Sequence, residues 1–149
     1  MKIKEITENK SRFIDLLLIG DEEESMINKY LEESTLFILY DNDILISVCA
    51  VVIKDSDTIE IKNLATYPKY QNKGYASALM DFVCNKYRKE FQYLILGTGE
   101  NSKTLTFYKK RGFTEYKRIK NFFTENYSHP IYENGIQLTD MIYLKRFIK

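Results

Sequence analysis

The chain has 149 residues, of which 44% are hydrophobic and 29% are charged, as expected for one globular domain with its own core. Its 22 basic and 21 acidic residues give a net charge of +1, which argues against a nucleic-acid-binding protein that relies on bulk positive charge. No Cys/His cluster has metal-ligand spacing, and no apolar run approaches the ~18 residues of a membrane helix. The start of the chain lacks the apolar core of a signal peptide. We therefore expect a single cytoplasmic domain over residues 1–149, with no metal, nucleic-acid or membrane partner.

Hydrophobic periodicity predicts strands and helices in alternation along the chain. The first half reads as a strand at 2–7, a helix at 8–19, a second helix opened by a capping box of Asp21 and Glu24, and strands at 35–40, 44–53 and 58–66. The second half reads as a helix at 75–89, a strand at 93–96, a helix at 102–111, a strand at 113–120, a loop at 121–135 and a strand at 136–146. This order indicates an α/β domain on one mixed sheet.

The strand at 58–66 contains a change of phase. Ile59 and Ile61 share one parity, whereas Leu64 and Thr66 share the other. A period-2 pattern that shifts by one residue predicts a β-bulge near Lys62 and Asn63. The alternative is that Asn63 is only a polar residue near the end of a strand.

The segment that follows, Gln71-Asn72-Lys73-Gly74-Tyr75-Ala76, lies between this strand and the helix predicted at 75–89. Such a turn directs free backbone N–H groups and the positive end of the helix dipole toward one point, which favours phosphate. Gly74 and Ala76 leave room for close approach of a pyrophosphate. The alternative is an ordinary turn. Neither of the common glycine-rich nucleotide motifs, Gly-x-x-x-x-Gly-Lys-Ser/Thr or Gly-x-Gly-x-x-Gly, is present.

A second motif follows, with Asn101 placed ahead of the run Phe107-Tyr108-Lys109-Lys110-Arg111-Gly112-Phe113. Together, the Gln-x-x-Gly-x-Ala loop and this Asn…Tyr-x-Lys-x-Gly-Phe pattern resemble the GNAT superfamily of acetyl-CoA-dependent N-acetyltransferases over residues 58–113. Ala76 and Thr66 depart mildly from the family pattern, which more often has Gly and an aliphatic residue there. The segments near residues 97–99 and 130–135 resemble a little-characterised bacterial subgroup. The resemblance implies a sheet of six to seven strands, about four flanking helices, and a splay after the bulged fourth strand.

The same resemblance implies how acetyl-CoA would bind. The loop, which comprises Gln71, Asn72, Lys73, Gly74, Tyr75 and Ala76, would hold the pyrophosphate through the amides of residues 72–76. The backbone of Leu64, Ala65 and Thr66 would pair with pantetheine as a strand would. A backbone N–H near Ala65 would polarise the thioester carbonyl, and Asn101 would hydrogen-bond the pantetheine arm.

Two side chains are candidates for acid and base. Tyr108 would protonate the departing CoA thiolate, because a phenol can donate to a sulfur whose thiol pKa is about 8.5. The alternative for Tyr108 is a core position on the face of Leu105. Glu60 precedes Gln71 at the spacing of the base in the histone-modifying branch of the family, and would accept the amine proton. The alternative for Glu60 is an exposed strand carboxylate.

The predicted function is transfer of an acetyl group from acetyl-CoA to a primary amine by direct attack in a ternary complex. Neither cysteine, Cys49 or Cys84, lies in a nucleophile motif, so no acyl-enzyme is expected. The alternatives are a CoA-binding regulatory domain without catalysis, a plain interaction domain, and an enzyme for a longer acyl donor. Asp140 is predicted to be paired within the fold, because it shares the parity of apolar neighbours. The acceptor, and the choice between monomer and homodimer, stay open.

Overall fold

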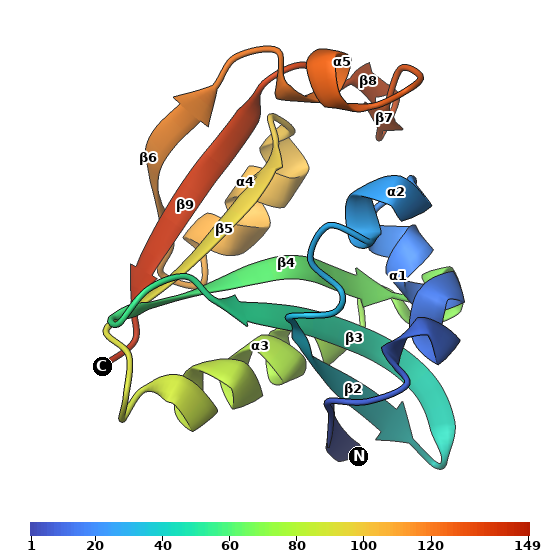
Figure 1. The fold of residues 1–149 in the computed structure, drawn as a ribbon, viewed down its shortest axis with the longest axis vertical. Coiled ribbons are helices and arrows are strands. Elements are labelled where there is room, and N and C mark those ends of the chain that lie inside the picture. Colours follow the sequence, from blue (N-terminus) through green and yellow to red (C-terminus); the bar gives the residue numbers. More distant parts are fainter.

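The computed structural model describes residues 1–149, and one mixed seven-stranded sheet organises it, in the order β1-β2-β3-β4-β5-β9-β6 (Figure 1). The strands are β1 (Lys2–Ile6), β2 (Thr35–Asp41), β3 (Ile44–Ile53), β4 (Thr58–Thr66), β5 (Tyr93–Gly99), β6 (Thr114–Ile119) and β9 (Met141–Phe147), with a separate hairpin of β7 (Tyr132–Glu133) and β8 (Ile136–Gln137). The helices are α1 (Ile14–Gly20), α2 (Glu24–Ile27), α3 (Tyr75–Tyr87), α4 (Ser102–Lys109) and α5 (Phe122–Asn126), with 3-10 helices η1 (Lys10–Phe13) and η2 (Pro68–Tyr70). The predicted α/β class with a mixed sheet is confirmed.

Both faces of the sheet are covered, which explains the continuous apolar run of β3. On one face, side chains such as Cys49 and Val51 pack against α3 in a cluster of 18 buried residues. On the other face, their neighbours Val48 and Ala50 pack against α1 in a cluster of 12. Both cysteines are buried free thiols. None of the helices has the length and apolar character that crossing a membrane requires.

The predicted bulge and splay are both present. Ala50 of β3 pairs with Asn63, but its neighbour Val51 pairs with Ile61, so Lys62 is the extra residue of β4. The parallel pairing of β4 with β5 begins at Thr58 and ends at Ile61, and the two strands then diverge (Figure 1). The sheet is therefore open along the second half of β4.

The predicted capping box is wrong. The N-cap of α2 is Glu23, which makes no side-chain cap bond, and α2 is a single turn. Asp21 instead accepts a hydrogen bond from the Tyr127 hydroxyl at 2.9 Å. The Asp21 carboxylate, which the local pattern predicts to cap α2, thus bonds to a residue far along the chain. The predicted helix at 8–19 is also shorter, because its first turns form η1.

The predicted last strand at 136–146 is wrong in its first half. Asn134 and Gly135 adopt positive φ values of 51° and 76° and turn the chain, so that Ile136 pairs back with Glu133. This is the two-residue hairpin that an Asn-Gly pair favours. The strand β9 begins only at Met141, and the predicted 121–135 loop contains α5 and β7. Strand β5 also continues through Gly99, beyond its predicted end at 96.

Asp140, just before β9, is paired within the fold, as predicted. Its carboxylate accepts hydrogen bonds from Arg118 at 2.6 Å and from the Asn121 backbone N–H at 2.9 Å. The Asn121 bond and then the Arg118 bond lower the pKa of Asp140.

The contact between Gly20 and Asn63 locks the end of α1 onto β4. A Cβ on Gly20 would lie 2.2 Å from Asn63 Oδ1, and Asn63 Nδ2 donates to Leu17 O at 2.9 Å. Gly20→Ala should therefore lower the free energy of unfolding by ~1–3 kcal/mol, measured by urea denaturation. In an Asn63→Ala background the same change should cost clearly less, since only the contact with Ala65 Cβ at 3.1 Å would remain. An equal cost in both backgrounds would show that this contact is not the cause.

Candidate active site

The loop before α3 presents a row of free backbone donors. None of the N–H groups of residues 72–77 donates a hydrogen bond within the chain, and the helix ladder begins with Ala78 N to Gly74 O at 3.0 Å. Asn72 and Gly74 have φ values of 62° and 87°, so the chain turns tightly into the helix. Consecutive amides at a helix N-terminus form an anion site. A Cβ on Gly74 would meet nothing within 4 Å, so the space before this site is open.

These amides border a cavity of about 550 Å³, here called the loop cavity. Leu64 and Thr66 of β4, Tyr108 of α4 and Arg111 line it together with the loop. Gln71 does not face an anion, since its Nε2 donates to Thr66 O at 3.0 Å and so ties the loop to the end of β4. The cavity thus runs from these free amides to the open edge of the sheet.

Thr66, the polar residue at a position where an aliphatic residue is more usual, has a hydrogen-bonding partner in the fold. Its hydroxyl lies 2.9 Å from Ser47 Oγ, and Ser47 also donates to Ala65 O at 2.7 Å. Ala65 faces the α1 side of the sheet, in the smaller core cluster. Only Leu64 and Thr66 of the three predicted pantetheine contacts therefore line the loop cavity.

Tyr108 lies between two cavities. It borders the loop cavity and also a second hollow of about 410 Å³, here called the splay cavity, which Ile61, Lys62 and Leu96 line from the strands. Its ring packs edge-on against Phe107 and Phe113, and burial raises the pKa of its phenol. Tyr108 thus packs in the core, as its alternative interpretation predicts, and also borders both cavities, while its predicted role as the acid stays a prediction.

Asn101 is 2% exposed, and its side chain makes hydrogen bonds to other residues of the chain. Its Oδ1 accepts from the backbone N–H groups of Lys103 and Thr104 at the start of α4, and its Nδ2 donates to Glu133 O at 3.2 Å. The side chain is thus a helix N-cap that also holds the β7–β8 hairpin. The predicted hydrogen bond from Asn101 to pantetheine stays a prediction.

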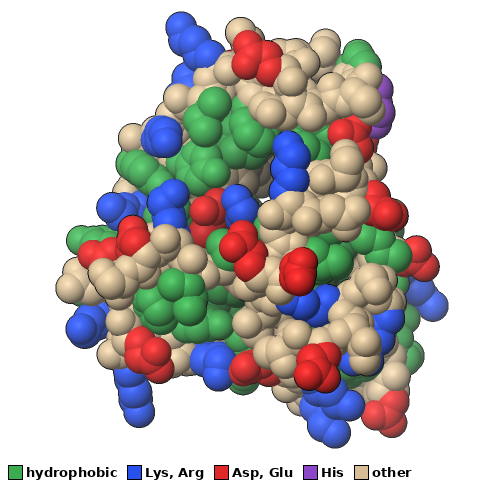
Figure 2. Space-filling view, in the orientation of Figure 1, with side chains coloured by type: hydrophobic (Ala, Val, Ile, Leu, Met, Phe, Trp, Pro, Cys, Tyr) green, Lys and Arg blue, Asp and Glu red, His purple; other side chains and the backbone are tan.

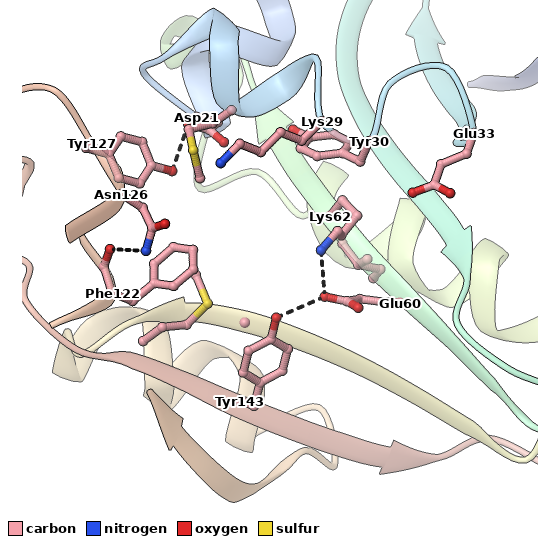
Figure 3. Close-up of a pocket in the computed structure, with 14 residues that line it drawn as sticks. Asp21, Lys29, Tyr30, Glu33, Glu60, Lys62, Phe122, Asn126, Tyr127 and Tyr143 are labelled. Atoms are coloured by element: carbon pink, nitrogen blue, oxygen red, sulfur yellow. Dashed lines mark hydrogen bonds and ion pairs between the residues drawn. The ribbon is translucent and has the colours of Figure 1, made fainter. Parts of the chain in front are cut away.

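Glu60 is buried, at 6% exposure, rather than an exposed strand carboxylate. Its Oε2 accepts from Lys62 Nζ at 3.2 Å and from the Tyr143 hydroxyl at 3.3 Å (Figure 3). Tyr143 lies on β9, and β5 lies between β9 and β4. Tyr143 pairs with Gly97 of β5, where a Cβ would lie 3.0 Å from its ring. The missing side chain at Gly97 therefore lets Tyr143 reach across a strand to Glu60.

Glu60 opens into a cavity of about 310 Å³ on the α2 side of the splay, here called the tyrosine cavity. Its lining combines aromatic and charged side chains, among them Tyr30, Tyr127, Tyr143, Phe122, Lys29, Lys62, Asp21, Glu33 and Glu60 (Figure 3). In the space-filling view, this face is hollowed between the two halves of the sheet, with charged side chains beside an apolar patch (Figure 2).

A bridge of polar contacts closes one side of the tyrosine cavity. Tyr127, after α5, donates to Asp21, and the Ser128 backbone N–H donates to Glu23 Oε1 at 3.0 Å. Burial raises the pKa of Asp21, an effect that the Tyr127 hydrogen bond opposes. Burial and then the charge of Asp21 raise the pKa of Tyr127. The segment at 121–135 is thereby fixed against the loop before α2.

The splay brings together most of the predicted site. The loop amides, Leu64, Thr66 and Tyr108 line cavities on one side, and Glu60 lies on the other. Sequence reasoning missed Gly97, Lys62 and Tyr143 as contributors. Gly97 carried a signal, since a glycine within a strand often marks a close approach of other groups. The sequence around Tyr143 contained no such signal, because the contact of Tyr143 with Glu60 depends on the order of the strands in the sheet.

Comparison with known proteins identifies the family. Residues 32–115, more than half of the chain, match the acetyltransferase (GNAT) domain family. The chain is 32% identical, over 92% of its length and 90% of the relative's, to a Bacillus subtilis protein named as the uncharacterized N-acetyltransferase YvbK. The structure matches a GNAT family acetyltransferase from Elizabethkingia anophelis with acetyl-CoA bound, at a TM-score of 0.91 and 36% identity over 98% of this chain and 97% of that one. A Bacillus subtilis acetyltransferase in complex with CoA matches at 0.88 and 29% identity, over 99% of each chain. By these likenesses, this chain is an acyltransferase and a member of the GNAT family.

Proposed function

We propose that this protein transfers an acetyl group from acetyl-CoA to the nitrogen of a primary amine, with both substrates bound at once. The observation that carries the proposal is the row of free N–H groups at residues 72–77, which opens onto a cavity that leads to the unpaired edge of β4. An anion site joined to an open strand edge suits a molecule with a pyrophosphate at one end and amide groups along its arm. The Elizabethkingia neighbour was solved with acetyl-CoA bound, and the Bacillus neighbour with CoA.

In this proposal, the co-substrate completes the sheet. Its pyrophosphate accepts hydrogen bonds from the loop amides, and its pantetheine amides pair with the backbone of Leu64 and Thr66. The thioester then lies near the splay cavity, beside Tyr108. A free backbone N–H of β4 in this region would stabilise the oxyanion of the tetrahedral intermediate.

Starting from a protonated amine, the reaction removes two protons from the nitrogen and supplies one to the sulfur. A primary amine with an ordinary pKa of about 10.4 is mostly protonated at pH 7, and must lose a proton to attack. Glu60 is the proposed base, directly or through a water molecule. As the nitrogen bonds to the carbonyl carbon, the carbon–sulfur bond breaks, and Tyr108 donates a proton to the departing thiolate. The nitrogen then loses its second proton, which restores the phenol. Most of the rate enhancement would come from the positioning of the two substrates and from the hydrogen bond to the oxyanion.

The acceptor amine would enter from the tyrosine cavity. This is the cavity that Glu60 lines, and it lies on the opposite side of the splay from the anion site. Its aromatic walls favour an acceptor with an apolar body, and the bridge from Tyr127 to Asp21 limits its width. The whole reaction would thus take place across the splay of one domain.

The test is release of the CoA thiol in the presence of a panel of primary amines. The wild type should acetylate at least one of them. Glu60→Gln should lower kcat/KM by about 100-fold at pH 7, and by less as the pH nears the amine's own pKa, because the amine then needs no base. Glu33→Gln, a change of a carboxylate in the same cavity, is the control. Full activity of Glu60→Gln at pH 7 would remove Glu60 from the mechanism.

A further inference from the structure

Lys62 has an unusual position in the sheet. It is the extra residue of the β4 bulge, so it has no cross-strand partner on β3, and the pairing of β4 with β5 ends one residue earlier, at Ile61. Its side chain, 31% exposed, lines both the tyrosine cavity and the splay cavity. A lysine is therefore placed where the two halves of the proposed reaction meet.

The amine of Lys62 already contacts the proposed base. Its Nζ donates to Glu60 Oε2 at 3.2 Å, and the Tyr143 hydroxyl holds the same oxygen from the β9 side (Figure 3). Lys29 lines the tyrosine cavity from its other wall, but its ammonium group makes no ion pair or hydrogen bond, and it does not line the splay cavity. The two lysines therefore differ in the contact that a nucleophilic amine would need.

The splay cavity completes the arrangement. Lys62 lines this hollow together with Tyr108 and Leu64, the proposed acid and one of the proposed pantetheine contacts. Glu60 lines only the tyrosine cavity and Tyr108 lines only the splay and loop cavities, so Lys62, which lines both the tyrosine and the splay cavity, places a primary amine between a carboxylate that can accept a proton and a phenol that can donate one. Such preorganisation replaces a collision between two molecules with a reaction inside one.

We propose that Lys62 is an acetylation site of the enzyme itself, modified from the acetyl-CoA bound to the same chain. This inference rests on the proposed function. Lys62 Nζ would lose a proton to Glu60 and attack the thioester carbonyl carbon. A nitrogen–carbon bond forms, the carbon–sulfur bond breaks, and the thiolate leaves with a proton from Tyr108. The nitrogen then gives up its second proton, which restores the phenol. The products are an N-acetyl-lysine, free CoA and the one proton that Glu60 passes to solvent, with no further reactant.

The modification would change the site in two ways. Acetylation removes the positive charge of Lys62, so Glu60 loses its ion-pair partner. It also leaves an acetyl group in the tyrosine cavity or at its border, where the acceptor would bind. A primary amine that occupies this cavity should therefore slow the modification of Lys62, because both compete for the same thioester.

The test is peptide mapping by mass spectrometry after incubation of the full chain with acetyl-CoA and no other amine. At saturating acetyl-CoA, Lys62 should gain an acetyl group at least about 100-fold faster than Lys29 in the same sample. Its rate should saturate with acetyl-CoA and should not depend on protein concentration, whereas chemical acetylation of Lys29 should rise in proportion to acetyl-CoA. Glu60→Gln should slow the acetylation of Lys62 and leave the rate of acetylation of Lys29 unchanged.

Four results would overturn the inference. Equal rates at Lys62 and Lys29 would show that Lys62 is only an ion-pair partner of Glu60. A rate at Lys62 that rises with protein concentration would show transfer between molecules. Acetylation of added amines without modification of Lys62 would reject self-acetylation and keep the proposed function, whereas failure of acetyl-CoA to bind, seen by calorimetry, would reject both.

Discussion

Replacement of Gly74 with glutamate should weaken acetyl-CoA binding by at least about 100-fold, which corresponds to about 3 kcal/mol. Two physical effects add up. Gly74 has a φ of 87°, a conformation that costs a residue with a side chain ~1–2 kcal/mol. The new carboxylate would also project into the open space before the free amides of residues 72–77, where it would repel the pyrophosphate. Calorimetric titration with acetyl-CoA measures the change directly.

Gly135→Glu is the matched control for this experiment. Gly135 also has a positive φ, of 76°, and also has open space around its missing Cβ, but it lies in the turn between β7 and β8. It should bear a similar backbone strain and keep its affinity for acetyl-CoA. Wild-type affinity in Gly74→Glu would mean that the loop is an ordinary turn and that the co-substrate binds elsewhere.

Loss of the Tyr108 hydroxyl should slow the chemical step and leave acetyl-CoA binding nearly unchanged. Tyr108→Phe should lower kcat by about 100-fold, which is at the low end of the effect of a general acid. The ring would keep its packing against Phe107 and Phe113, so the fold should tolerate the change. Steady-state kinetics and calorimetry on the same sample separate the two effects.

The pH dependence gives this prediction a second readout. Burial raises the pKa of Tyr108 above its ordinary value, so the phenol keeps its proton through neutral and mildly alkaline pH. Wild-type activity should therefore not fall for lack of this proton below about pH 10. Tyr87→Phe, at another half-buried tyrosine in the same core but outside these cavities, is the control. An unchanged kcat in Tyr108→Phe would show that Tyr108 is a core residue and not the general acid.

Local patterns in the sequence were sufficient for the parts of the site that lie close together in the chain. The loop of Gln71 to Ala76 and the phase shift around Lys62 depend on neighbouring residues only, and the row of free amides and the bulge follow from them. Asn101 shows the limit of such reasoning. Its predicted position at the start of α4 is right, but which of its atoms are already bonded depends on Glu133, far along the chain.

The contacts that sequence reasoning missed depend on the order of strands. Tyr143 reaches Glu60 only because β9 lies next to β5 and because Gly97 leaves space between them. The wrong capping box has a similar cause, since Asp21 is bonded to Tyr127, which comes much later in the sequence. The last strand failed for a different reason. The Asn134-Gly135 pair favours a tight hairpin, whereas the apolar alternation after it favours one long strand, and the pairing of Ile136 with Glu133 decides for the hairpin.

The splay has a consequence for the protein without its co-substrate. Residues 63–66 of β4 pair with β3 on one side only, so the middle of the sheet contains a strand edge. Edges of this kind are templates for the strands of other molecules, and proteins usually hide or charge them. Here the bound co-substrate would cover the edge, since its pantetheine arm would occupy the edge whenever acetyl-CoA is plentiful. Depletion of acetyl-CoA would then put solubility at risk along with activity, and preparations stripped of CoA should be the first to aggregate.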